Sequence, residues 1–385
     1  MNKTERLFDK SSRIKSFNAS VISCEMLDDG KYAVLLDKTA FFPNEGGQSC
    51  DTGIIDGVNV ISVDEKGGII THTLTSPVEI GKNACCEIDF EPRFRKMQNH
   101  TAEHIVSGII HRLFGYDNVG FHLGDGYMTA DFNGELSEEN ILEVETLTNE
   151  AIFECRSVRA YYPREEELKA LEYRSKLDFY ENVRIVEIEG VDKCACCAPH
   201  VENTGEIGLC KIVDAIRYKG GMRLTMLAGR DALADYRQRQ DQIKRISVAI
   251  SARQSEVADG VDRMISEIGE QKGKIANLKK ELMTLRLEKL NETDENILIF
   301  EDDGDMLALR GFVNEAVKKT TKLCACFSGN DESGYKYIIA SENIPLRALS
   351  KDISAALGGK GGGSDLMIQG SVTATQKQIS EFFEC

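Results

Sequence analysis

The sequence predicts an α+β fold in four parts: a β barrel, a mixed α+β domain, a helical arm and a small α/β domain. Apolar residues follow the period of β-strands over the first 90 residues, and the period becomes helical from about Arg93. A proline-free stretch, residues 231–292, then carries apolar residues every seven positions. A chain of 385 residues is long enough to build several domains, each with its own core.

Residues 1–90 predict the N-terminal β barrel. The expected strands lie in SVISCEML, KYAVLLDKTAFF, GVNVISVDEKGGIITHTL and NACCEIDF, which are separated by glycine and aspartate turns. Residues 91–230 predict the α+β domain. Its first helix, RFRKMQNHTAEHIVSGIIHRLFG, ends at Gly115, and a second follows Ser137, which is a suitable N-cap. Further strands are expected in VRAYYP, VRIVEI and LCKIVDAIRYKGGMRLTMLAG.

Residues 231–292 predict the arm, and residues 293–385, where strands alternate with helices, predict the small α/β domain. The arm repeats the first and fourth positions of about four heptads. Two interpretations remain open: a coiled coil that joins two subunits, or a helical hairpin that packs on itself. The first positions are Val261, Ile268, Ile275 and Leu282, and the fourth positions are Met264, Gln271, Leu278 and Leu285.

The charge balance excludes binding of nucleic acid through bulk positive charge. With 47 basic and 63 acidic residues, the formal net charge is −16. Between Gly205 and Arg245, however, the sequence contains nine basic and five acidic residues, which give a local net charge of 9 − 5 = +4. This segment, which includes Arg217 and Arg223, is a candidate track for phosphates; a solvated helix surface is the alternative.

The chain contains no run of 18 apolar residues, and its N-terminus lacks the apolar core of a signal peptide. We therefore expect a cytoplasmic protein that neither spans a membrane nor is secreted. Its twelve cysteines are then expected to be reduced thiols or metal ligands rather than a disulfide framework.

Two pairs of residues predict a metal site. His100 and His104 stand four apart on the predicted helix, so their imidazoles project from one face, and Cys196 and His200 repeat this spacing downstream. Together they supply a full tetrahedral set for Zn²⁺. Cys194 and Cys197 compete with Cys196, which is preferred because its spacing to His200 matches the histidine pair. The alternative is that all four side chains are ordinary core residues.

Other motifs contribute candidate site residues. Glu103 completes an H-x-x-E-H pattern in which Glu acts as a general base, although an exposed carboxylate or a partner of a histidine is the alternative. In FFPNEGGQSCDTG, Gly46 and Gly47 allow close approach of a ligand, and Gln48 can donate and accept hydrogen bonds. A plain hairpin turn is the other interpretation of that motif.

A glycine cluster near the C-terminus supplies two further candidates. Gly361 and Gly362, within GGKGGG, are candidates for backbone contact with phosphate, and a flexible loop is the alternative.

FFPNEGGQSCDTG, HTAEH, CCAPHVENTGEIG and GGKGGGSDLMIQG occur in this order, and in this combination the chain resembles the editing half of alanyl-tRNA synthetase. The resemblance covers nearly the whole chain. It implies that residues 91–230 are a zinc-dependent tRNA editing domain and residues 293–385 a DHH-associated C-terminal domain. Because the chain begins directly at the β barrel, it is more similar to the free-standing, long AlaX type of editing protein.

The resemblance implies a trans-editing hydrolase that removes serine, and possibly glycine, from tRNA(Ala) without ATP. It also implies zinc held by His100, His104, Cys196 and His200, and a substrate pocket that includes Gln48. We expect a homodimer, formed through the arm or the C-terminal domain, that has no membrane partner.

Zinc can activate water or polarise an ester carbonyl, but four protein ligands fill a tetrahedral site. Replacement of one ligand by water, expansion of the site, and binding of the substrate amino group by the metal all remain open. Two other functions are also open: a zinc protease or amidohydrolase that uses Glu103, and a non-catalytic tRNA-binding relative with structural zinc.

Overall fold

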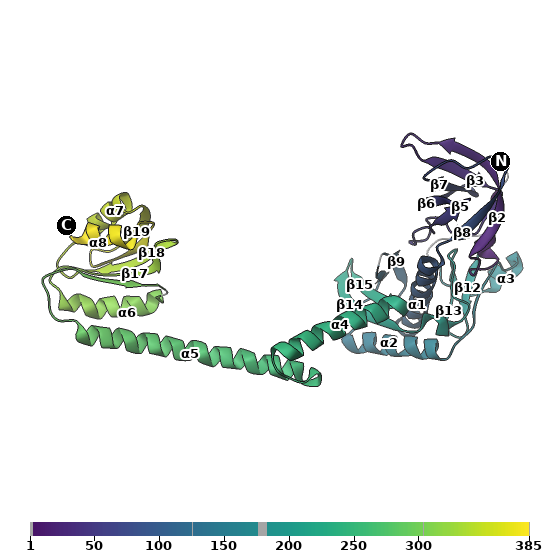
Figure 1. Ribbon diagram of the computed structural model, residues 1–385. Helices are drawn as coiled ribbons and strands as arrows, with labels where there is room; N and C mark the ends of the chain where they lie inside the picture. Colours follow the sequence, from purple (N-terminus) through teal and green to yellow (C-terminus); the bar gives the residue numbers. More distant parts are fainter. Residues whose placement is uncertain (1–2, 125, 176–182, 303, 385) are drawn as a thin grey trace. The chain divides into compact units, whose positions relative to one another are not determined.

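The computed structural model describes residues 3–124, 126–175, 183–302 and 304–384 (Figure 1). The fold is mixed α+β, as predicted. The chain divides into two compact units, Met1–Arg245 and Ile246–Cys385. The finer division into four domains stays a prediction. The eleven cysteines that the structure describes are free thiols, and no helix of the described residues is long and apolar enough to cross a membrane.

Six strands near the N-terminus close into a barrel in the order β2-β3-β7-β6-β5-β8. A short parallel pair, β1 and β4, and the 3-10 turn η1 accompany it. Side chains alternate between the inside and the outside of the barrel, so that in β8 Ala84, Cys86 and Ile88 are buried while their neighbours are exposed. The bounds are β1 Glu5–Arg6, η1 Leu7–Asp9, β2 Ser16–Met26, β3 Tyr32–Leu36, β4 Lys38–Thr39, β5 Gly53–Ile55, β6 Val58–Lys66, β7 Ile69–Leu74 and β8 Asn83–Ile88.

The rest of the first unit is built around α1 (Phe90–Phe114), which is buried without interruption from residue 96 to residue 110. This helix ends at Gly115 in the left-handed conformation, as predicted. Ser137 caps α2 (Glu138–Phe153) by accepting a hydrogen bond from the Asn140 amide. Two sheets, ordered β14-β15-β10-β9 and β11-β12-β13, complete the unit. Their bounds are β9 Asn118–Leu123, β10 Met128–Phe132, β11 Val158–Tyr161, β12 Ile185–Ile188, β13 Asp192–Ala195, β14 Cys210–Tyr218 and β15 Gly221–Ala228, with α3 Glu165–Ala170 and η2 Thr204–Ile207 between strands.

The predicted arm is two helices, α4 (Gly229–Ala249) and α5 (Val257–Lys289), with the turn η3 (Gln254–Glu256) before α5. The apolar heptad positions of α5 are 37–63% exposed. Both interpretations of the arm, a coiled coil that joins two subunits and a helical hairpin, stay predictions. Gly260 is buried near the start of α5, and Met283 and Leu287 near its end pack against the core beneath α6.

The second unit contains a five-stranded sheet ordered β16-β17-β18-β20-β19, in which only β16 and β17 run parallel. Helix α6 lies between α5 and the sheet (Figure 1). The glycine cluster forms the edge strand β19, so it is not a loop. The bounds are β16 Ile297–Glu301, α6 Met306–Ala316, η4 Val317–Lys319, β17 Cys324–Asn330, β18 Gly334–Ala340, α7 Leu346–Ala356, β19 Gly359–Gly363, β20 Met367–Val372 and α8 Gln376–Glu384.

Candidate metal centre

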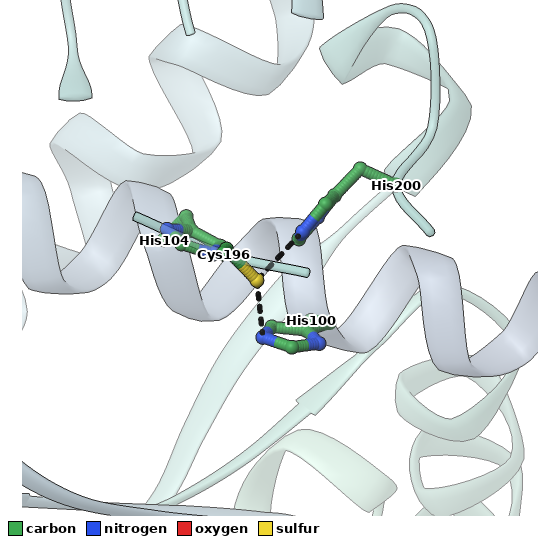
Figure 2. A group of neighbouring side chains, drawn as sticks. All are labelled: His100, His104, Cys196 and His200. Atoms are coloured by element: carbon green, nitrogen blue, oxygen red, sulfur yellow. Dashed lines mark hydrogen bonds between the residues drawn. The ribbon is translucent and has the colours of Figure 1, made fainter. Parts of the chain in front are cut away.

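Helix α1 and the segment after β13 bring the four predicted ligands together. His100 and His104 lie one turn apart on the buried face of α1, with their rings stacked at 5.3 Å between centroids. Cys196 and His200 face them from the segment that follows β13 (Figure 2). The three histidine side chains are only 3–4% exposed, so the site is enclosed by protein.

The donor atoms have the spacing of a tetrahedral metal site. The Cys196 Sγ atom lies 3.3 Å from His200 Nε2 and 3.7 Å from His100 Nε2. All four ligand atoms lie within 4.8 Å of one another. Zn–S and Zn–N bonds of about 2.3 and 2.0–2.1 Å at tetrahedral angles place sulfur and nitrogen about 3.6 Å apart. The arrangement therefore fits zinc in both ligand type and spacing.

Hydrogen bonds to the other ring nitrogens orient the three histidines. His100 Nδ1 donates to Gln48 Oε1 at 3.0 Å, and His104 Nδ1 donates to the Asp192 carboxylate at 3.1 Å. His200 Nδ1 lies 3.1 Å from the Thr101 hydroxyl oxygen. That oxygen accepts, because the Thr101 hydroxyl donates its own hydrogen to Met97 O.

Each Nδ1 therefore carries the proton, and each Nε2 offers a lone pair to the centre. Among the described residues, His104 Nε2 is buried without a hydrogen-bond partner. An unpaired buried nitrogen is costly in the absence of a ligand, and a metal ion would satisfy it.

Electrostatics favour the metal-binding forms of Cys196 and His200, whereas burial lowers the pKa of His104 but Cys194 and Asp192 outweigh it and raise that pKa well above its ordinary value. Burial by itself raises the pKa of the Cys196 thiol, but the imidazoles of His100 and His200 lower it more, so its pKa lies well below the ordinary value. Burial lowers the pKa of His200 to about 3. Asp192 is held as a carboxylate because Arg174 and His104 outweigh burial and lower its pKa to about 2. The Arg174 guanidinium donates a hydrogen bond to each oxygen of Asp192, both at 2.7 Å.

The two competing cysteines lie outside this cluster. The Cys197 sulfur is beside the glycine turn, where a Cβ atom on Gly46 would lie 3.6 Å from it, and burial raises the pKa of this thiol. Cys194 lies near His104 and Asp192, which form a second group of three metal-binding residue types. The ion pair between Asp192 and Arg174 makes that second group a poor cation site.

The glycine motif lies directly against the cluster. Gly46 and Gly47 have φ values of 64° and 80°, and a Cβ atom on Gly47 would lie 2.6 Å from the carbonyl oxygen of Phe121. The Phe121 ring packs on His100 at 4.6 Å between centroids. Gln48 is 3% exposed, and its Nε2 atom has no hydrogen-bond partner among the described residues. Gln48 thus carries a spare donor next to His100, one of the four candidate metal ligands.

Glu103 points to a different set of partners. Its carboxylate accepts hydrogen bonds from Ser107 and Asn118, and the side chain is 4% exposed. Among the described residues, the group of converging ligand atoms includes neighbouring His104 but not Glu103. His111, on the same helix, pairs at the surface with Asp117 and also lies outside that group.

The predicted phosphate track is largely neutralised. Arg217 pairs with Glu135 at 3.0 Å, and Arg223 grips both oxygens of Asp131. Three more of the nine basic residues, Lys211, Arg230 and Arg239, also form ion pairs. Gly361 and Gly362 lie in β19, in the second unit, whereas the ligand cluster belongs to the first.

Sequence reasoning missed the residues that support the ligands. Asp192, Thr101 and Arg174 have no spacing signature of their own, although metal-binding histidines commonly donate to a carboxylate. The only available signal was the proximity of Asp192 to the cysteine cluster in VDKCACC. Its pairing with His104 depends on the packing of β13 against α1, which local patterns do not show.

Comparison with known proteins places this geometry in a family context. Residues 183–264 match the family model described as the second additional domain of threonyl and alanyl tRNA synthetases. The chain is 27% identical over 396 residues to the alanyl-tRNA editing protein AlaX-L of Pyrococcus horikoshii, which covers 97% of this chain and 96% of that protein.

Alanine-tRNA ligases are similar over one part of their length. The chain is 28% identical to the ligase of Ignicoccus hospitalis and 28% identical to that of Pyrococcus abyssi, over 90% and 97% of this chain respectively. It spans 42% of the length of each ligase. The resemblance predicted from the motifs is therefore confirmed along nearly the whole chain, which is similar to an alanyl-tRNA editing protein of the long AlaX type and to part of the alanine-tRNA ligases.

Proposed function

We propose that this protein is a trans-editing hydrolase that cleaves the ester bond between a wrongly attached amino acid and tRNA(Ala), with serine as the main substrate and glycine as a second. The observation that carries the proposal is the convergence of three histidine Nε2 atoms and one thiolate beside the spare amide donor of Gln48. The similarity to AlaX-L along both chains supports the same activity.

Zinc is the cofactor that we propose for this site, held by His100, His104, Cys196 and His200. When bound, it would polarise the ester carbonyl or lower the pKa of a nearby water. The residues of the chain have separate tasks. Asp192 and Thr101 hold His104 and His200 in the tautomer that binds metal, and the low pKa of Cys196 keeps it a thiolate.

Gln48 is the group that we assign to the substrate. Its Oε1 atom is occupied by His100, whereas its Nε2 is buried and has no partner among the described residues. This donor can bind the hydroxyl of a seryl group or the ester carbonyl as negative charge develops there. A buried donor left unpaired by alanine would favour serine, since sites built to bind a hydroxyl reject substrates that lack it.

Glu103 remains a candidate catalytic residue, but its hydrogen bonds support an indirect role. A general base must reach the attacking water, whereas this carboxylate already accepts hydrogen bonds from Ser107 and Asn118. The same contacts argue against a zinc protease that uses Glu103. We propose that Glu103 fixes β9 against α1.

For tRNA binding, we propose contacts to exposed Arg237, Lys244 and Arg245 on α4, together with Arg217 and Arg223 if their ion pairs open. The glycine strand that contains Gly361 and Gly362 is a further candidate surface. A net charge of −16 repels RNA elsewhere, so binding should weaken steeply as salt rises.

We also propose a homodimer that forms through α5. Its exposed apolar positions, such as Ile275 and Leu278, would be buried against the partner helix.

One observation favours a different function. Four protein ligands complete a tetrahedral zinc site, which is typical of structural rather than catalytic zinc. On that alternative, the protein binds tRNA without hydrolysing the ester.

Deacylation of tRNA(Ala) charged with serine, glycine or alanine, at enzyme excess, separates the two functions. The proposal predicts rapid release of serine, slower release of glycine and little release of alanine. If the zinc-loaded protein retards the charged tRNA in a gel but leaves all three esters intact, the non-catalytic function is correct.

A further inference from the structure

Successive turns of α1 hold four consecutive residues of the glycine motif. His100 donates to Gln48, Lys96 donates to the backbone carbonyls of Ser49 and Cys50, and Arg93 pairs with Asp51. The four residues run antiparallel to the helix, and every contact comes from one helical face, because positions 93, 96 and 100 lie about one turn apart.

The spans of the two segments match. Seven helical residues, from Arg93 to His100, rise about 10.5 Å along the helix. Three chain steps, from Asp51 back to Gln48, span at most about 10–11 Å. Residues 48–51 can therefore lie alongside this stretch of the helix, with Asp51 at Arg93 and Gln48 at His100. The contacts from α1 thus help to define where Gln48 lies along the helix.

The pair of Arg93 and Asp51 forms the far anchor. Their side chains are 0% and 1% exposed, and Arg93 Nε lies 2.9 Å from both carboxylate oxygens. Asp51 also accepts from the Phe42 amide at 2.6 Å, and Arg93 donates to the Ala40 carbonyl. Every charged group is thus satisfied. The anchor closes the loop between Phe42 and Asp51, which contains Gly46 and Gly47.

Lys96 gives stronger evidence for a positioning role than the pair of Arg93 and Asp51 does. It is 9% exposed, and its ammonium group donates to two backbone carbonyls, those of Ser49 and Cys50. Burial lowers its pKa. Burying an ammonium group in this way is expensive compared with an apolar side chain of similar length. Methionine, which has a similar length but no donor, cannot make these two hydrogen bonds.

We infer that Lys96, anchored by Arg93 and Asp51, is a positioning residue that sets the Gln48 amide against the metal centre. This inference rests on the proposed deacylase function, since it assigns the task of Gln48 to the hydrolysis. Lys96 acts through Gln48 and does not contact the substrate. The backbone of Gln48 is bridged to Glu45 and to Leu123, so the task of Lys96 is to hold the segment that follows, residues 49 and 50, and with it the direction of the Gln48 side chain.

A double-mutant cycle tests the inference. Lys96→Met and Gln48→Ala are made singly and together, and the single-turnover rate of serine release from tRNA(Ala) is measured for each. We expect each single variant to lose about 10-fold to 100-fold, the double variant to be no slower than Gln48→Ala, and Lys96→Arg to restore most of the rate. Losses that multiply in the double variant would overturn the inference, because independent groups contribute additively in free energy.

A second readout is independent of turnover. In the metal-free protein labelled with ¹⁵N-histidine, His100 should show the Nδ1-protonated tautomer in the wild type and a tautomer mixture in Lys96→Met. An unchanged His100 signal in Lys96→Met would contradict the positioning role. Thermal unfolding and circular dichroism show whether the variant is folded. Lys82→Met, which removes an exposed ion pair with Asp56, is the matched control and should leave both the rate and the tautomer unchanged.

The failure of the proposed function gives a different result. If the zinc-loaded wild type releases no amino acid, the deacylase proposal fails, while the tautomer measurement still tests whether Lys96 positions Gln48. If the wild type is active and the cycle is additive, only the inference about Lys96 fails.

Discussion

His104 Nδ1 lies 3.1 Å from the Oδ2 atom of Asp192, and both side chains are 3% exposed. The contact fixes the tautomer that directs His104 Nε2 to the centre of the ligand cluster. It also joins β13 to α1, so the metal centre depends on how these two elements pack.

Replacing Asp192 by Asn should weaken zinc binding about 10-fold to 100-fold, because the imidazole loses the carboxylate that orients it. Affinity can be measured by competition with a chelator. The matched control is Asp117→Asn, which alters an exposed pair with His111 on the same helix and should not change the affinity. Equal zinc affinity in Asp192→Asn and the wild type would show that this contact does not support a metal ligand.

The glycine turn offers a test at equal backbone strain. Gly47 and Gly30 have φ values of 80° and 81°, but an added Cβ atom meets the Phe121 carbonyl only at Gly47 and lies in open space at Gly30. Gly30→Ala should cost about 1–2 kcal/mol of local stability, from the left-handed backbone alone. Gly47→Ala should cost clearly more and slow deacylation, as measured by hydrogen exchange and single-turnover rates. Equal effects in the two variants would contradict the claim that the close approach of Gly47 to the Phe121 carbonyl matters for the site.

We predict that the barrel loses stability at acidic pH because of His72. It is fully buried, with its ring between the Thr39 hydroxyl and the Val34 carbonyl, and burial lowers its pKa to about 4. The unfolded chain takes up a proton near pH 6.5, whereas the folded barrel does so only near pH 4, so stability is full above about pH 6.5 and falls as the pH drops toward 4.

From pH 7 to pH 5, His72 should account for a loss of roughly 2 kcal/mol. Hydrogen exchange of the barrel amides measures this loss, and His72→Gln should flatten the pH dependence. A wild type and a His72→Gln variant with the same slope would contradict the assignment.

We predict that the exposed apolar positions of α5 form a dimer, and that one charged substitution among them disrupts it. Leu278 is 63% exposed at a fourth heptad position, so Leu278→Glu should convert the dimer to monomers in light scattering after gel filtration. Leu307→Glu changes a residue that is 78% exposed on α6, away from the apolar positions of α5, and should leave the dimer intact. A wild type that is monomeric at micromolar concentration would disprove the proposed assembly.

The sequence predicted the ligand cluster because its spacing is local. A four-residue interval on a helix places His100 and His104 on one face whatever the rest of the fold, and the same interval singled out Cys196 and His200. The supporting residues could not be found this way, since Asp192 and Arg174 reach His104 only through tertiary packing.

Two other features show the limits of local patterns. The net charge of +4 counted along residues 205–245 overlooked acidic partners from other elements, such as Asp131 and Glu135. The glycine cluster lacks the β-branched residues that usually mark a strand. Its glycines serve packing instead, since a Cβ atom on Gly361 would lie 2.0 Å from the Tyr337 hydroxyl. Charge pairing and strand packing are both set by residues distant in sequence.

The most direct test of the account is serine release from Ser-tRNA(Ala) by one protein preparation in three states: zinc-loaded, stripped of metal, and reloaded with zinc. A Cys196→Ala variant at the same concentration serves as the comparison. We expect release by the loaded and reloaded protein and little release by the stripped protein or by Cys196→Ala. Equal rates in the loaded protein, the stripped protein and the variant would contradict the claim that the cluster of His100, His104, Cys196 and His200 is the centre of this activity.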